Sequence, residues 1–285
     1  MISRDDITRN IESLPAFSQT SLKLSHILQK PDFSLSEFEE TISYDPSLVA
    51  NLLKLANSSY FGIPRKINNI KLAINLLGAK RVFEAAIANE LGKILPPVLK
   101  GYQISSTDFW KHCAAVAIIA TNIAKEKDHS AEMIFTAGLL HDLGKLVVST
   151  YLEQNPSQMT QLIETNLTET EVEQKMLGID HCEVGELICK KWKLTSDISE
   201  VNRYHHNPED TVDESSRNIV AMVHIADSLS HTMGMGSDVA ELMRSVSPWA
   251  LARFNMKTHD LERLASESLD DILELSEIFN EIRSK

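Results

Sequence analysis

The sequence lacks an apolar run of about eighteen residues, which is the length that a membrane-spanning helix requires. Its first residues, MISRDDITRNIESLP, also lack the basic and then apolar order of a secretion signal. We therefore expect no membrane span and place the protein in the cytoplasm.

Cysteine is scarce, since Cys113, Cys182 and Cys189 are the only three. An odd number without a C-x-x-C pair predicts neither a disulfide framework nor a thiolate zinc site. We expect the three thiols to serve as small buried hydrophobic side chains.

Positive charge is in deficit, with 28 Lys and Arg against 40 Asp and Glu and a formal net charge of −12. The densest basic groups are pairs such as Lys80-Arg81 and Lys190-Lys191. Such a chain would repel a phosphate backbone, so nucleic acid is not an expected partner. A helix-turn-helix in INLLGAKRVFEAAIA would place Gly78 in its turn, but its second helix offers only Lys80 and Arg81 near its start. We favour Gly78 as a glycine between two packed core helices.

Strand patterns, in which apolar and polar residues alternate, are absent over any useful length. Helical signals occur instead. Ser34 and Glu37 have the spacing of a capping box, and Asp45-Pro46 is typical of a cap followed by a first-turn proline. The chain has 285 residues, 43% of them hydrophobic, which is enough for a sizeable core. The prediction is an all-α, multi-helical bundle.

Two prolines and a glycine interrupt the helical pattern in ILPPVLKGYQISS, near residues 95 to 106. This seam predicts an N-terminal helical subdomain over residues 1–100 and a helical core with C-terminal helices over residues 101–285. Histidine is divided unevenly by it, because His26 precedes the seam and the other nine histidines follow it.

Histidine and aspartate recur after the seam at spacings that suit a metal ion. Asp108 and His112 are four residues apart, so one helix face can carry both. His141 and Asp142 are adjacent in HDLGK, and Lys145 follows three residues later. The remaining candidates are His181, His205, His206, His224, Asp227 and His231. Imidazole and carboxylate together favour one or two divalent ions of iron, manganese, nickel or zinc.

Each candidate also has an ordinary structural interpretation. His112 could be a helix residue with one hydrogen-bond partner, and His205-His206 could lie at a helix C-terminus, where imidazolium is favoured. Asp227 lies among apolar residues and would need a partner if it faces inward. By default we assign surface or core positions to the remaining histidines of this region, which are His129, His224, His231 and His259.

The order of the candidates resembles that of the HD superfamily of metal-dependent phosphohydrolases. The resemblance implies two ion sites that share Asp142. One is formed by His112, His141, Asp142 and Asp227, and the other by His181, His205, His206 and Asp142. It also implies that Asp142 and Lys145 are catalytic, and it matches Asp108 to an additional carboxylate ligand.

HDLGK is similar to the corresponding motif of the HD-GYP cyclic-di-GMP phosphodiesterases. After His205-His206, however, the chain reads NPEDTVDESS, without a glycine-tyrosine-proline motif. This departure argues against cyclic-di-GMP as the substrate.

The stretches LANSSYFG, LLGAKRV, FWKHCAAVA and AGLLHDLGKLV occur in the order typical of the HDOD domain, the HD-related output domain of bacterial signalling proteins. The resemblance covers roughly residues 10 to 210. It implies an HD-like helical core preceded by a helical bundle, and a regulatory role in members that have mostly lost their metal ligands. This sequence keeps all of the principal ligand positions.

Two functions remain open at this point. One is a regulatory HDOD protein that binds a signalling partner and retains the metal site. The other is an active phosphohydrolase for a nucleotide or another phosphorylated small molecule, in which hydroxide held between two metals attacks phosphorus. In either case we expect a loaded site, because clustered titratable groups in a core are costly without an ion.

Overall fold

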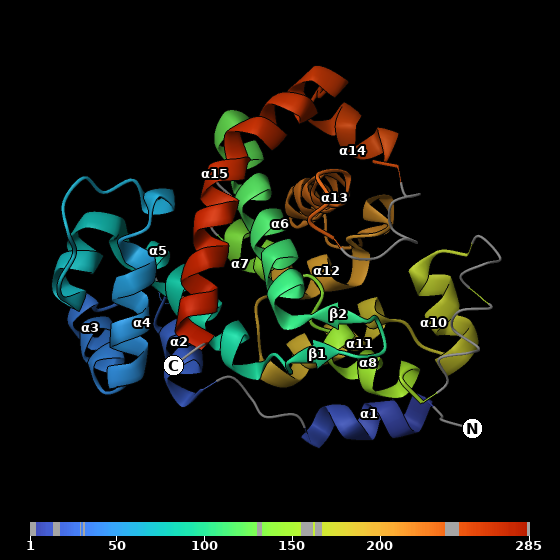
Figure 1. Ribbon diagram of the computed structural model, residues 1–285, viewed down its shortest axis with the longest axis horizontal. Helices are drawn as coiled ribbons and strands as arrows, with labels where there is room; N and C mark the ends of the chain where they lie inside the picture. The colour runs from blue at the N-terminus through green and yellow to red at the C-terminus, as the bar shows by residue number, and fades with distance from the viewer. Residues whose placement is uncertain are drawn as a thin grey trace. The chain divides into compact units, whose positions relative to one another are not determined.

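The computed structural model describes residues 4–13, 18–28, 30, 32–129, 133–154, 162, 167–236 and 245–283. Over these residues the protein is helical apart from one short antiparallel ribbon, which confirms the predicted all-α class. The chain divides into two compact units (Figure 1). Unit 1 contains residues 1–14 and 95–269, and unit 2 contains residues 15–94 and 270–285. Across the described residues, no helix is both long and apolar enough to cross a membrane.

Unit 2 consists of α2 (Gln19–Leu28), α3 (Leu35–Ser43), α4 (Pro46–Ala56), the short 3-10 helix η1 (Ser59–Phe61) and α5 (Ile70–Ile94), together with the last part of α15 (Thr258–Arg283). The predicted Asp45 cap is confirmed, whereas of the Ser34–Glu37 capping box the structure shows the bond to Ser34 Oγ, and the Glu37 carboxylate pairs with Lys30. Ser34 Oγ accepts a hydrogen bond from Glu37 N at 3.2 Å, and Asp45 Oδ1 accepts one from Leu48 N at 2.9 Å. Side-chain caps of this kind satisfy backbone N–H groups that have no partner within the helix.

Gly78 interrupts α5, as expected for a glycine between two helices. Its backbone has φ 82° and ψ 158°, between two helical stretches. A Cβ at Gly78 would meet no neighbouring atom, so backbone conformation and not space explains the glycine there.

Unit 1 begins with α1 (Arg4–Ser13). It continues with β1 (Val98–Leu99), β2 (Ile104–Ser105), α6 (Ser106–Glu126), α7 (Ile134–Leu139), α8 (Lys145–Leu152), α10 (Glu169–Leu177), α11 (His181–Trp192), α12 (Ser196–Tyr204), the 3-10 helix η2 (Pro208–Asp210), α13 (Arg217–Thr232) and α14 (Pro248–Arg253), followed by the first part of α15.

The core of unit 1 is formed by α6 packing against both α7 and α13. Every residue of α13 from Ile219 to His231 is buried, so this helix has no solvent face along that stretch. A helix buried all round normally carries only apolar side chains. The histidines and the aspartate on α13 therefore need partners inside the unit. The three cysteines are buried as well, as predicted.

Candidate metal centre

The predicted ligands come from five separate places in unit 1 and meet in one cluster. His112 lies on α6, His141 and Asp142 lie in the turn between α7 and α8, and Asp227 lies on α13. His181 is the first residue of α11, while His205 and His206 directly follow α12. All seven side chains are buried, with at most 8% of any residue exposed.

Asp142 lies between two groups of imidazoles and turns one carboxylate oxygen toward each. Its Oδ1 is 3.5 Å from both His181 Nε2 and His205 Nε2. Its Oδ2 is 3.4 Å from His141 Nε2 and 3.8 Å from His112 Nε2. A carboxylate placed in this way can bridge two ions that are held by different histidines.

Asp227 forms the second carboxylate of the cluster. Its Oδ1 lies 3.2 Å from His112 Nε2 and 3.7 Å from His141 Nε2, and its Oδ2 lies 3.9 Å from His206 Nδ1. His206 Nε2 is in turn 3.0 Å from His181 Nε2. His206 therefore links the Asp227 side of the cluster to the His181 side.

The hydrogen bonds of four rings determine which nitrogen is left for a metal. His141 Nδ1 lies 2.8 Å from the carbonyl oxygen of Gly138, and His205 Nδ1 lies 3.1 Å from that of Val201. A carbonyl can only accept, so each Nδ1 carries the proton and each Nε2 has a free lone pair.

His112 and His181 have the same tautomer. Ser230 Oγ donates to the carbonyl oxygen of Asp227 at 2.9 Å, so it accepts from His112 Nδ1, also at 2.9 Å. His181 Nδ1 donates to the buried carboxylate of Glu173 at 2.8 Å. Partners of this kind fix the orientation of a ligating imidazole.

Several buried atoms in the cluster make no hydrogen bond to any described residue. They are His112 Nε2, His141 Nε2, His205 Nε2, Asp142 Oδ1 and Asp227 Oδ1. Buried acceptors without a donor are costly, and a cation shared among them removes that cost. The donor set of imidazole and carboxylate therefore fits a divalent ion, as the sequence predicted.

Three groups of the cluster have charge states that suit a metal. Burial lowers the pKa of both His112 and His205 to about 4, which keeps these rings neutral at pH 7. Burial opposes ionisation of Asp142, but Lys145 and His141 outweigh it and hold the pKa of this carboxyl well below its usual range. Neutral imidazoles and ionised carboxylates are the forms that bind metal ions.

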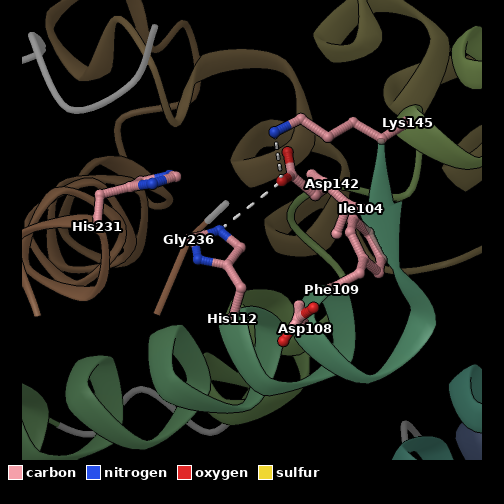
Figure 2. Close-up of a pocket in the computed structure, with 8 residues that line it drawn as sticks. All are labelled: Ile104, Asp108, Phe109, His112, Asp142, Lys145, His231 and Gly236. Atoms are coloured by element: carbon pink, nitrogen blue, oxygen red, sulfur yellow. Dashed lines mark ion pairs between the residues drawn. The ribbon is translucent and has the colours of Figure 1, made fainter. Parts of the chain in front are cut away.

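Lys145 lies beside the cluster, at the start of α8. Figure 2 shows its amine next to Asp142, where Nζ is 2.9 Å from Asp142 Oδ2. The same Nζ is 2.9 Å from Glu169 Oε2. A lysine amine held between two buried carboxylates lies close to any anion bound at Asp142.

The glycine of HDLGK has a packing role. A Cβ at Gly144 would collide with the carbonyl oxygen of His181, at the start of α11. The absence of a side chain lets the turn that carries Asp142 lie directly against the helix that carries His181.

Two acidic residues of α10, Glu169 and Glu173, belong to the site and were missed by the sequence analysis. Glu173 is fully buried and accepts hydrogen bonds from Tyr102 Oη at 2.6 Å and from the backbone N of His181 at 2.7 Å. The two glutamates are four residues apart, which places them on one face of α10. That spacing was the available signal, but it is equally typical of a solvent-exposed helix face.

His231 was among the sequence candidates but was assigned to the surface or core by default. It lies on α13 one turn after Asp227, and its Nε2 is 3.5 Å from Asp227 Oδ1. Figure 2 shows its ring on the opposite side of the cavity from Lys145. The Asp-x-x-x-His spacing is the one that singled out Asp108 and His112, so the sequence did contain the signal.

The remaining candidates lie at the edge of the cluster or outside it. Asp108 is exposed, and its carboxylate accepts a hydrogen bond from Ser105 Oγ at 2.6 Å. His224 Nδ1 donates to the carbonyl oxygen of His205 at 2.7 Å, which ties α13 to the end of α12. His129 forms a hydrogen bond with Asn218, and the side chain of His259 is 71% exposed.

The Cys182 sulfur lies within 4.8 Å of ligand atoms of His181, His205 and His206, a position that the sequence did not indicate.

Two cavities adjoin the cluster. The smaller one, shown in Figure 2, is lined by His112, Asp142, Lys145 and His231 together with Asp108, and holds about 10 Å³. The larger one has a volume of about 460 Å³ and includes His206 in its wall. We call it the His206 cavity. Its other lining residues are Thr168, Thr170, Glu171, Asn207, Glu209, His224, Ser245, Ser247 and Pro248.

The chain is similar to known proteins over most of its length. An uncharacterized protein of Treponema pallidum is 27% identical over 209 residues, which are 70% of this chain and 39% of that protein. Ribonuclease Y of Onion yellows phytoplasma is 27% identical over 154 residues, which are 52% of this chain and 23% of the relative. These matches span well under half of either relative's length.

Among solved structures, an HDOD domain protein with unknown function from Geobacter sulfurreducens has a TM-score of 0.74 and 26% identity, with 97% of each chain covered. The family model of the HDOD domain matches residues 14–208. This range contains every predicted ligand except Asp227. Because the match takes in more than half of the sequence, the chain belongs to the HDOD domain family.

Proposed function

We propose that this protein is a metal-dependent phosphohydrolase. The observation that carries the proposal is the position of Asp142, which faces His181 and His205 with Oδ1 and His112 and His141 with Oδ2. The free Nε2 atoms and the unpaired carboxylate oxygens around it fit a pair of divalent ions of iron, manganese, nickel or zinc.

A pair of such ions, when bound, supplies Lewis acidity toward a phosphoryl oxygen and lowers the pKa of water. The protein's own residues hold that reaction in place. Glu173 and Ser230 orient His181 and His112 through Nδ1, so that each Nε2 points into the cluster. Lys145, held by Asp142 and Glu169, supplies positive charge beside the position of a phosphate.

The experiment is a measurement of metal per chain by inductively coupled plasma mass spectrometry, on protein purified without chelators or a nickel column. A phosphatase and phosphodiesterase screen follows, using protein reconstituted with iron, manganese, nickel or zinc. Asp142→Ala is compared with Asp210→Ala, an exposed aspartate of the same unit. We expect one to two equivalents and metal-dependent turnover, both lost only in Asp142→Ala. A folded protein that binds no metal, or that binds metal and hydrolyses none of the substrates, contradicts the proposal.

A regulatory function is the second candidate, and one observation favours it. All of the predicted ligands belong to unit 1, so α2 to α5 of unit 2 are available for another task. On this alternative the metal site is structural and unit 2 binds a signalling protein. Loss of partner binding on substitution in unit 2, without loss of metal, would support it.

A further inference from the structure

We propose that the His206 cavity binds the alcohol part of the substrate and selects a phosphomonoester whose alcohol is neutral and rich in hydroxyl groups, such as a polyol or sugar monophosphate. Polyphosphates and nucleic acid are disfavoured there. This inference rests on the proposed function, because it places the phosphate at the Asp142 cluster.

The cavity reaches the cluster through His206. The ring of His206 lies in the cavity wall, and its Nε2 is 3.0 Å from His181 Nε2 while its Nδ1 is 3.9 Å from Asp227 Oδ2. A volume of about 460 Å³ is within the range of small-molecule sites. A group esterified to a phosphate at the cluster can therefore extend past His206 into this space.

The walls carry groups that both donate and accept hydrogen bonds. Thr168 and Thr170 contribute hydroxyls from the start of α10, and Ser245 and Ser247 contribute hydroxyls from the segment before α14. Asn207, in the turn after α12, contributes a carboxamide. Ser247 Oγ donates to Glu209 Oε2 over a long distance of 3.4 Å, a contact that a ligand can replace. Hydroxyl and amide groups complement the hydroxyls of a polyol.

Among the described residues, the charge of the walls has one sign. Glu171 and Glu209 line the cavity, and none of the described residues that line it is Lys or Arg. His224 adds no positive charge, because its Nδ1 donates to the carbonyl oxygen of His205 and its Nε2 accepts from Ser247 N. A second or third phosphate here would lie close to the carboxylate of Glu209, which repels it.

The walls also offer little for a nucleobase. The imidazoles of His206 and His224 are the only aromatic rings among those lining residues that the structure describes. Protein sites for unpaired bases typically stack them on aromatic side chains or arginine. The same walls therefore disfavour a single-stranded nucleic acid as well as a nucleoside triphosphate.

Isothermal titration calorimetry on metal-loaded protein tests this inference without requiring turnover. The probes are methylphosphonate, a non-hydrolysable polyol phosphonate, and a non-hydrolysable analogue of a nucleoside triphosphate. We expect the polyol phosphonate to bind about tenfold tighter than methylphosphonate, the gain from one or two added hydrogen bonds. Asn207→Ala should remove part of that gain. Equal affinities for the polyol phosphonate and methylphosphonate would overturn the inference.

Charge reversal tests whether the carboxylates of the His206 cavity disfavour polyphosphates. Glu209→Lys should raise affinity for the triphosphate analogue relative to the polyol phosphonate by about tenfold. Glu214→Lys makes the same change in net charge at an exposed position outside the cavity and should leave this ratio unchanged. The same shift in both variants would contradict selection by the cavity.

The two proposals can fail separately. Hydrolysis of p-nitrophenyl phosphate without discrimination among the phosphonates would overturn this inference and leave the phosphohydrolase standing. Selective binding of the polyol phosphonate without hydrolysis of any phosphoester would retain the cavity's specificity and overturn the phosphohydrolase. Absence of binding by all three probes, together with absence of hydrolysis of any phosphoester, would contradict both.

Discussion

His231 lies one turn after Asp227 on the fully buried helix α13, and its Nε2 is 3.5 Å from the Asp227 oxygen that also faces His112 and His141. The rings of His231 and His112 are 4.6 Å apart, centroid to centroid. Three imidazoles thus converge on one carboxylate oxygen. This arrangement predicts that His231 contributes to the metal affinity of the Asp227 half of the site.

Replacing His231 should therefore weaken metal binding. We expect His231→Ala to retain less than one half of the wild-type metal after dialysis, because one of three imidazoles near Asp227 Oδ1 is lost. Mass spectrometry of bound metal measures the effect. His259→Ala removes an exposed histidine of α15 and is the matched control. Equal metal content in the two variants would assign His231 a packing role only.

Glu173 should act on metal affinity through His181. Its carboxylate accepts a hydrogen bond from His181 Nδ1. Glu173→Gln therefore orients the His181 ring less firmly and makes this ring a less basic ligand. We expect metal affinity to fall by about 10- to 100-fold, as measured by competition with a chromophoric chelator. Glu262→Gln, at an exposed position of α15, should bind metal like the wild type. A Glu173→Gln variant with unchanged affinity would show that His181 is oriented without this carboxylate.

Gly144→Ala should destabilise unit 1 and move Asp142 away from His181. The new Cβ would overlap the His181 carbonyl oxygen, and relief requires movement of α8 or α11. Overpacking of this kind costs about 1–3 kcal/mol in the free energy of unfolding. Urea denaturation measures this cost. Thr150→Ala, on the exposed side of α8, is the control and should change stability by less. Equal effects would mean that α8 and α11 can move apart freely.

Removing the metal should lower thermal stability. An ion that binds only the folded state at 100 times its dissociation constant adds about 2.7 kcal/mol. Differential scanning calorimetry with and without chelator should therefore show a lower midpoint for the chelated protein, reversed by adding the metal back. In Asp142→Ala, chelator should have no effect. An unchanged wild-type midpoint would contradict a loaded site in the folded protein.

The cysteines predict a separate pH effect. Burial raises the pKa of the Cys113 thiol and of the Cys189 thiol, whereas a cysteine in the unfolded chain ionises near pH 8.5. Above that pH the unfolded state binds fewer protons than the folded state, so the stabilising contribution of these thiols is lost as pH rises. We expect a thiol reagent at pH 8 to label neither residue until urea is added. The fall in stability between pH 7 and 9.5 should be smaller in Cys189→Ala. Rapid labelling of the folded protein at either position would contradict their burial.

Local sequence determined much of the helical framework. Ser34, Asp45 and Gly78 act within a few residues of themselves, through a cap or through a positive φ, so their effects could be predicted without knowledge of packing. The all-α class followed from the same local patterns. The predicted ligands were identified by residue type, spacing and family resemblance. Their catalytic and metal-binding roles stay predictions.

The sequence by itself therefore determined the helical class, the cap positions and the set of titratable side chains that a metal could use. Only the tertiary structure decided that Asp142 stands between two groups of imidazoles, and that Glu173 and His231 belong beside it. The physical reason is that α8, α10 and α11 pack on one another while α13 packs against α6, α7 and α12, and spacing along one helix does not encode such long-range packing. Glu173 has the pattern of an exposed helix charge until His181 and Tyr102 are placed against it.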